Sequence, residues 1–239
     1  MPDKYFGKYT GIVKDNRDAQ QLGQLQLSVP AIFPPDEVVI ARAALPYGYF
    51  FVPEVGAKVW AEFEGGDSGL PLWTGVQYVA GEWPPEAQVD PPDKRVIKSA
   101  KGHVVTFDDT PGDEKIEIKT SSASGHTVTL DTQGIKVHDG VGQNDIVLGG
   151  SGVAVQTTAG QKVELTSSGI IIQTAIGQKI ELTSTGVTID AAVGIVTVTG
   201  ALVKLGAGTL PVIRIGDMGV GNLGAPVVMT VSTNAQVLA

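Results

Sequence analysis

The chain has 239 residues, a net charge of −8 and no cysteine, which excludes a disulfide scaffold and a thiolate metal site. Its acidic balance argues against a nucleic-acid groove, which needs clustered basic residues. No apolar segment approaches the roughly 18 residues of a membrane helix, and the N-terminal residues lack the apolar region of a secretory signal. We therefore expect a soluble protein made in the cytoplasm, with no nucleic-acid partner.

The first part of the chain predicts a small β-barrel. Short runs alternate apolar and polar residues, as strands with one buried face do. In the clearest run Val59, Ala61 and Phe63 share one face, whereas Trp60 and Glu62 share the other. About five such runs in fewer than 90 residues favour an OB-type barrel over residues 1–83, with a small β-sandwich as the alternative. Four of these runs are Tyr9–Lys14, Gly23–Val29, Lys58–Glu64 and Leu72–Val79.

The composition changes near residue 90. All three tryptophans, all five tyrosines and five of the six phenylalanines precede it, and only Phe107 follows. Two Pro-Pro pairs lie among charged residues between Trp83 and Arg95, which is typical of an extended, semi-rigid segment. We expect residues 84–98 to be a linker between two domains.

The second part of the chain is an internal repeat. Gly160 opens the sequence GQKVELTS, which returns 17 residues later at Gly177 as GQKIELTS. Glycines at 160, 169, 177, 186 and 194 alternate steps of 9 and 8 residues, and no proline occurs from 112 to 210. Each unit predicts one strand of four or five residues with a glycine at its corner, where positive φ carries no Cβ penalty. The predicted corner glycines are Gly125, Gly134, Gly142, Gly152, Gly160, Gly169, Gly177, Gly186 and Gly194.

The repeat units place apolar residues at alternating positions, so one face of each strand needs burial. A single chain would have to enclose this core with coils of 17 residues, fewer than the 20 or more that a monomeric β-helix usually has. Three intertwined chains that each give one strand per level enclose a core with units this short. We therefore predict that residues 99–205 form such a triple-stranded β-helix. Its predicted shaft-core residues are Val105, Phe107, Val128, Leu130, Ile135, Val137, Val163, Leu165, Ile170, Ile172, Ile180, Leu182, Val187 and Ile189.

The chain resembles a known family over roughly residues 8–205. The segments that carry the resemblance are VPEVGAKVWAEFEGGD (52–67), LPLWTG (70–75), YTGIVKDNRD (9–18), LGQLQLSV (22–29) and KSAKGHVVTFDD (98–109). They are similar to the central spikes of contractile tails: phage baseplate assembly protein V, the tail-lysozyme spikes and the VgrG proteins of type VI secretion. The resemblance implies an OB-fold collar, a triple-stranded β-helix and a homotrimer.

The same resemblance implies a mechanical role. The spike would dock on a baseplate hub through its OB domain and pierce the target cell envelope when the sheath contracts. It would belong to a virion tail or to a phage-tail-like injection particle assembled in the cytoplasm. The hub domain that precedes the barrel in VgrG is absent, so the hub would be a separate protein. No lysozyme domain fits between Trp83 and Lys98, so we do not expect the muramidase activity of the tail-lysozyme spikes. No His-x-His motif occurs, so we do not expect the iron that some phage spikes bind.

The remaining polar residues predict no catalytic, cofactor-binding or metal site. His103, His126 and His138 are interpreted as corner residues, and Asp108 and Asp109 as part of a solvated loop. The repeat aligns Lys162 and Glu164 with Lys179 and Glu181, which we interpret as surface ion pairs rather than as the charged cluster of a polysaccharide lyase. We expect a protein that is not an enzyme. A receptor-binding fibre or adhesin on a β-helical stalk is the alternative.

The apolar C-terminal region, residues 206–239, is expected to form the tip. Pro211–Asp217 resembles the opening strand of PAAR-type tip proteins, which cap such spikes. Either this region closes the shaft by itself or it receives a separate PAAR-like cap, and an exposed apolar end would otherwise favour aggregation.

Overall fold

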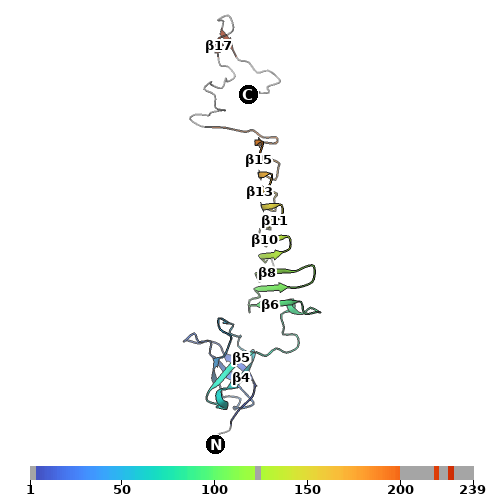
Figure 1. Cartoon of the computed structure of the whole chain (residues 1–239). Coiled ribbons are helices and arrows are strands. Elements are labelled where there is room, and N and C mark those ends of the chain that lie inside the picture. The colour runs from blue at the N-terminus through green and yellow to red at the C-terminus, as the bar shows by residue number, and fades with distance from the viewer. Residues whose placement is uncertain (1–3, 122–124, 200–217, 221–225, 229–239) are drawn as a thin grey trace.

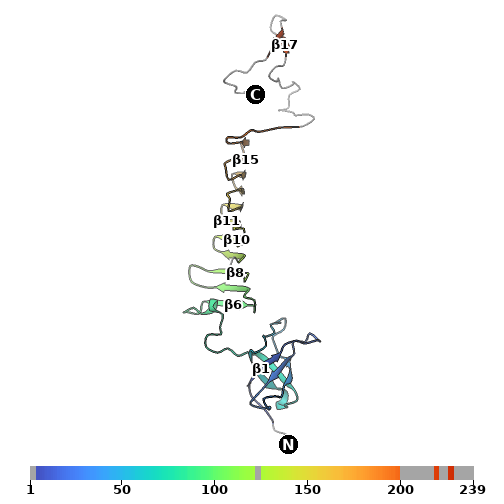
Figure 2. The same ribbon diagram turned by 180° about the vertical axis from the view of Figure 1, so that it is seen from behind.

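The computed structural model describes residues 4–121, 125–199, 218–220 and 226–228. The molecule is elongated: a small barrel lies at the N-terminal end, and a stack of short strands extends away from it (Figures 1 and 2). Of the expected tip region, only the short paired strands β17 (Met218–Val220) and β18 (Pro226–Val228) are described. Pro211–Asp217 lies outside the described residues.

The barrel is closed by five strands in the order β1-β2-β3-β5-β4. β3 and β5 pair in parallel through Arg42 and Leu72, and the other pairs are antiparallel. This arrangement is OB-like, so the prediction of an OB-type barrel is confirmed. The strands are β1 (Tyr9–Asp15), β2 (Leu25–Ser28), β3 (Val39–Ala43), β4 (Lys58–Phe63) and β5 (Pro71–Val76), and the 3-10 turn η1 (Glu64–Gly66) follows β4.

The alternating runs of the sequence form the core of the barrel. Val59, Ala61 and Phe63 on β4 are buried, as predicted, while Trp60 and Glu62 are only half-buried. Trp73 on β5 is enclosed, and its indole Nε1 donates a hydrogen bond of 2.9 Å to the carbonyl oxygen of Gly23. The remaining buried residues of this core are Val13, Leu25, Leu27, Val29 and Ala41.

Beyond the barrel, eleven antiparallel strands form one continuous sheet, in which each strand pairs with its neighbours in sequence. We call this sheet the ladder. Its first strand lies inside the segment 84–98 that was expected as a linker, and the 3-10 turn η2 (Pro85–Ala87) precedes it. The strands are β6 (Lys94–Lys98), β7 (Val104–Asp108), β8 (Lys115–Lys119), β9 (Thr127–Asp131), β10 (Gly134–Asp139), β11 (Asn144–Gly149), β12 (Gly152–Gln156), β13 (Lys162–Thr166), β14 (Gly169–Gln173), β15 (Lys179–Thr183) and β16 (Gly186–Asp190).

The repeat of 17 residues is therefore a hairpin: two strands that run in opposite directions. Tight turns join β9 to β10, β11 to β12, β13 to β14 and β15 to β16, and two residues lie between the paired strand ends, as in Thr166↔Gly169. Wider turns join β10 to β11, β12 to β13 and β14 to β15. Because the strands alternate in direction, from β9 onward the tight turns lie on one edge of the ladder and the wide turns on the other.

Glycine is required where a tight turn enters the next strand. Gly152 has a φ of +129°, and a Cβ there would lie 1.9 Å from the carbonyl oxygen of Leu165 on β13. Gly134 and Gly169 meet the facing strand at the same distance. Among the predicted corner glycines, Gly160, Gly177 and Gly186 also have positive φ, whereas Gly125, Gly142 and Gly194 do not. The left-handed backbone thus explains six of the predicted corners, and the other three hold glycine for a different reason.

Candidate assembly interface

One face of the ladder carries two continuous apolar columns. Cross-strand partners follow one another without a break, for example Val163↔Ile172↔Ile180↔Ile189 in one column and Leu165↔Ile170↔Leu182↔Val187 in the other. All of the predicted shaft-core residues lie in these columns. The prediction missed the further members Ile97, Ile116, Ile118, Ile146, Leu148, Val153 and Val155. The alternation KIEIK of β8 would have revealed two of them.

On strands β13 and β15 the apolar columns are more exposed than the charged residues between them. On β13, Val163 and Leu165 are 37% and 46% exposed, but the side chains of Lys162 and Glu164 are only 29% and 28% exposed. A sheet that is stable by itself buries its apolar face, so this face of the ladder lacks its covering layer within one chain.

The opposite face carries ion pairs within the chain. Lys162 Nζ lies 3.0 Å from Glu164 Oε2, and one hairpin further on Lys179 Nζ lies 2.7 Å from Glu181 Oε2. Glu181 raises the pKa of Lys179, because its carboxylate favours the charged ammonium. Exposed pairs of this kind add little stability, but they keep this face solvated.

A buried carboxylate joins the first three strands of the ladder. Asp108 is paired in register with Lys94 on β6 and Lys115 on β8, with Nζ–Oδ2 distances of 3.1 and 3.8 Å, and its side chain is 2% exposed. The Thr110 hydroxyl donates to it at 2.6 Å and, together with Lys94, lowers its pKa from 3.8 to about 2. The interpretation of Asp108 as part of a solvated loop was therefore wrong. Asp109, which pairs with Arg95, is exposed as expected.

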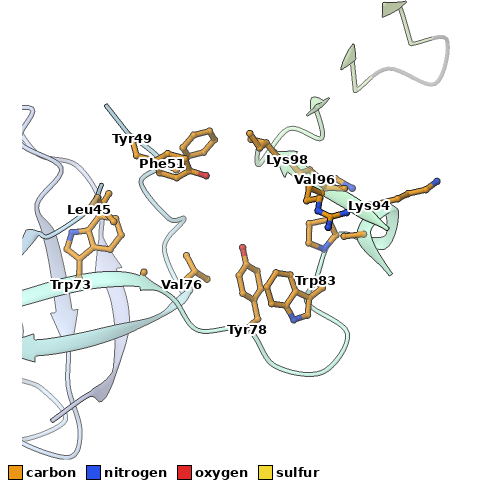
Figure 3. Close-up of a pocket in the computed structure, with 15 residues that line it drawn as sticks. Leu45, Tyr49, Phe51, Trp73, Val76, Tyr78, Trp83, Lys94, Val96 and Lys98 are labelled. Atoms are coloured by element: carbon orange, nitrogen blue, oxygen red, sulfur yellow. The ribbon is translucent and has the colours of Figure 1, made fainter. Parts of the chain in front are cut away.

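Aromatic residues surround a hollow of about 510 Å³ between the barrel and β6. Figure 3 shows Tyr49 and Phe51 on one side of it and Val96 and Lys98 on the other. Tyr78 stacks on Trp83, with ring centroids 4.2 Å apart. Lys98 binds Glu86 of η2 at 2.8 Å, so the segment that joins the two domains is held against the base of the ladder.

The histidines take part in local contacts. His138 Nδ1 lies 2.7 Å from Asp145 Oδ1, and His126 Nδ1 lies 3.1 Å from Asp139 Oδ1. The backbone N–H of His103 donates to the Ser99 hydroxyl at 3.0 Å. Over the described residues, no three His, Cys, Asp or Glu side chains converge as a metal site would require.

None of the described helical segments has the length and apolar character needed to cross a membrane.

An OB-like barrel followed by a strand ladder with one uncovered apolar face defines an all-β assembly protein. Comparison with protein families agrees: the OB domain of type VI secretion system and phage-baseplate injectors matches residues 9–78. The phage baseplate V C-terminal trimerisation domain matches residues 94–156. The chain thus belongs to the phage baseplate protein V and type VI secretion injector family, a family of structural baseplate spikes. Its trimerisation domain implies a homotrimer. Among curated proteins no match is found.

Proposed function

We propose that three copies of this chain form the central spike of a contractile-tail baseplate, and that its work is mechanical rather than catalytic. In this proposal the three ladders wind about a common axis and turn their apolar columns inward. The predicted shaft-core residues then form a dry core, and the ion-paired faces meet water. The shaft transmits the force of sheath contraction to the envelope of the target cell.

The observation that carries the proposal is the exposure of the apolar columns along the ladder. Over β13 the apolar side chains Val163 and Leu165 are more exposed than the charged Lys162. At about 25 cal/mol per Å² of apolar surface, leaving eleven strands in this state would be strongly unfavourable. Two further copies remove the exposure without any other protein, which agrees with the trimerisation domain of the family.

The barrel is the part that we propose to dock on a separate hub protein. Its loop between β3 and β4 carries the aromatic side chains Tyr47 and Phe50, which are exposed in the single chain. Neighbouring exposed aromatic residues on one loop are typical of protein interfaces. The loop lies outside the matched trimerisation domain, residues 94–156, which supports a contact other than the one between the three shafts.

The first test is the mass of the purified full-length chain by light scattering. We expect three times the chain mass of 24.8 kDa. The second test is the position of the protein in isolated particles: an antibody against the barrel should label the end of the tail tube. A single-chain mass, or label along fibres instead of at the tube, would refute the spike. Glycan binding by the shaft would favour an adhesin.

A further inference from the structure

We infer that the tips of the wide turns are knobs, and that each inserts between two tight turns of the neighbouring copy, which sets the register of the trimer. The inference rests on the proposed three-fold shaft and goes beyond it, because it assigns the contact at each corner. Both partner surfaces belong to this chain, and they lie on opposite edges of the same ladder.

The knobs are apolar residues that project from one edge. Val141, Ile176 and Val193 are 72%, 71% and 99% exposed, and Ala159 is exposed as well. Each one directly precedes a glycine, and the four follow one another at steps of 18, 17 and 17 residues. Three of them lie in wide turns, and Val193 lies in the turn after β16, the last strand of the ladder. Apolar residues at such regular intervals on turn tips have no partner within the described chain, and an exposed column of them is typical of an interface.

Three of the four turns that carry a knob share one backbone hydrogen bond, whereas in the β10–β11 turn Gly142 donates to the carboxylate of Asp139 instead. The N–H of Gly177 donates to the carbonyl oxygen of Thr174 at 3.1 Å, and the corresponding bonds from Gly160 to Thr157 and from Gly194 to Ala191 measure 2.9 and 2.8 Å. In each of these turns the knob immediately precedes the glycine, so it occupies the same place in the turn. The column therefore follows from the fold of the repeat and is not an accident of one loop.

The other edge offers gaps at matching heights. In a closed ring of three copies whose axis runs along the stack, equivalent residues lie at equal heights. A wide turn lies halfway between two tight turns along the stack, because the meander uses them alternately. The tip of the β14–β15 turn of one copy thus meets the neighbour's edge between two tight turns, where Gly169 pairs with Thr183.

The residues at these gaps are small. Val141 is matched with the pair Gly134↔Gly149 and Ile176 with the pair Gly169↔Thr183. Ala159 is matched with Gly152 and Thr166, which lie next to the pair Val153↔Leu165. Each of these gaps holds at least one glycine, and threonine is the largest residue at any of them. Beside the last two gaps lie the column pairs Val153↔Leu165 and Ile170↔Leu182, so a knob at this corner would extend the apolar core outward.

The absence of cysteine allows a direct test with the full-length protein. The variant I176C/T183C places one thiol on the knob and one beside its gap. Within a single chain the two positions lie at opposite ends of β15, roughly 14 Å or more apart, beyond the Cα separation of about 7 Å that a disulfide spans. Any disulfide between them therefore joins two copies. The matched control I176C/T166C moves the second thiol by one hairpin, about 10 Å along the stack.

After mild oxidation we expect I176C/T183C to run as a covalent trimer on a non-reducing gel, and the control to remain largely as single chains. Thr166 and Thr183 make matching hydrogen bonds, to Ser168 and Thr185 of their own tight turns, so both variants disturb the fold alike. Light scattering before oxidation separates the two hypotheses. A trimer that forms no disulfide in I176C/T183C, or forms it equally in the control, overturns the knob register alone. A single-chain mass of the unmodified protein overturns the spike itself.

Discussion

At the scale of single residues, Asp108 shows how one buried carboxylate fixes the start of the ladder. It receives hydrogen bonds from Thr110 and faces Lys94 and Lys115 across two strand pairs. These partners favour the charged form and hold the pKa of Asp108 at about 2. A one-residue slip of β6 would separate Asp108 from Lys94, and a slip of β8 would separate it from Lys115, so the cluster specifies the register of both strands.

The depressed pKa makes the ladder sensitive to acid. A carboxyl group whose pKa is lower in the folded state stabilises the fold above its unfolded pKa of about 4, and this contribution is lost as the pH falls through about 2. We expect D108N to lower the unfolding temperature at pH 7 and to flatten its decline between about pH 4 and pH 2. Thermal unfolding followed by circular dichroism over this range measures both effects.

The control for this prediction is D109N. Asp109 is the next residue in the chain, but its ion pair with Arg95 is exposed and should contribute little. D109N should therefore follow the unmodified protein at every pH. If D108N and the unmodified protein lose stability in parallel as the solution is acidified, Asp108 does not hold the base of the ladder.

At the scale of an element, β14 contains three consecutive isoleucines whose faces differ. Ile170 and Ile172 lie in the apolar columns, whereas Ile171 lies on the other face between Glu164 and Glu181. Neighbouring isoleucines on one strand thus face opposite sides: Ile170 and Ile172 face the proposed core, and Ile171 faces the solvated surface. The alternation of the strand alone assigns the faces, because successive side chains point to opposite sides.

This strand supplies its own matched pair of substitutions. We expect I172A to destabilise the trimer by about 2–5 kcal/mol per chain, as the loss of a buried isoleucine does. I171A should change the stability by no more than about 0.5–1 kcal/mol, because its site is partly exposed. Thermal unfolding at fixed trimer concentration measures both, and equal losses from the two substitutions would contradict a core on the column side.

At the scale of the whole molecule, the repeat makes the length of the shaft adjustable. Removal of residues 161–177 joins Gly160 to Gln178, which takes the place of Gln161. The remaining apolar residues then stay on the same face, and the tight and wide turns stay on their own edges. We expect a folded trimer whose shaft is shorter by two strands, about 10 Å. Electron microscopy of the purified trimer measures the length, and the light-scattering mass shows that the assembly is retained.

Removal of residues 161–168 instead deletes one strand and its turn. Ile170 and Ile172 would then take the places of Lys162 and Glu164 on the ion-paired face, because a shift of one position exchanges the faces. We expect this variant to aggregate or to remain unassembled. A soluble trimer from it, or an aggregate from the 17-residue deletion, would show that the phase of the repeat does not govern assembly.

Much of this architecture can be predicted from the sequence, because its signals are local. Period-two alternation identifies Val59, Ala61 and Phe63 as one buried face, and the glycine spacing locates the later strands of the ladder. The signals fail where no glycine or clear alternation marks the unit. β3 was missed, and Ile116 and Ile118 lie in a hairpin that departs from the 9-and-8 spacing. The family resemblance that the sequence segments carried was, in contrast, confirmed by the family matches.

The sequence by itself determined that short strands alternate with glycine turns and that one face of each strand is apolar. Only the tertiary structure decided how those strands pair. A period of eight or nine residues suits a chain that circles an axis and equally a chain that runs back and forth, because the local pattern is the same for both. The pairing of Lys162 with Gln173, and of Gln173 with Lys179, shows the second arrangement within one chain. The burial of Asp108 was decided in the same way, because its lysine partners come from different strands.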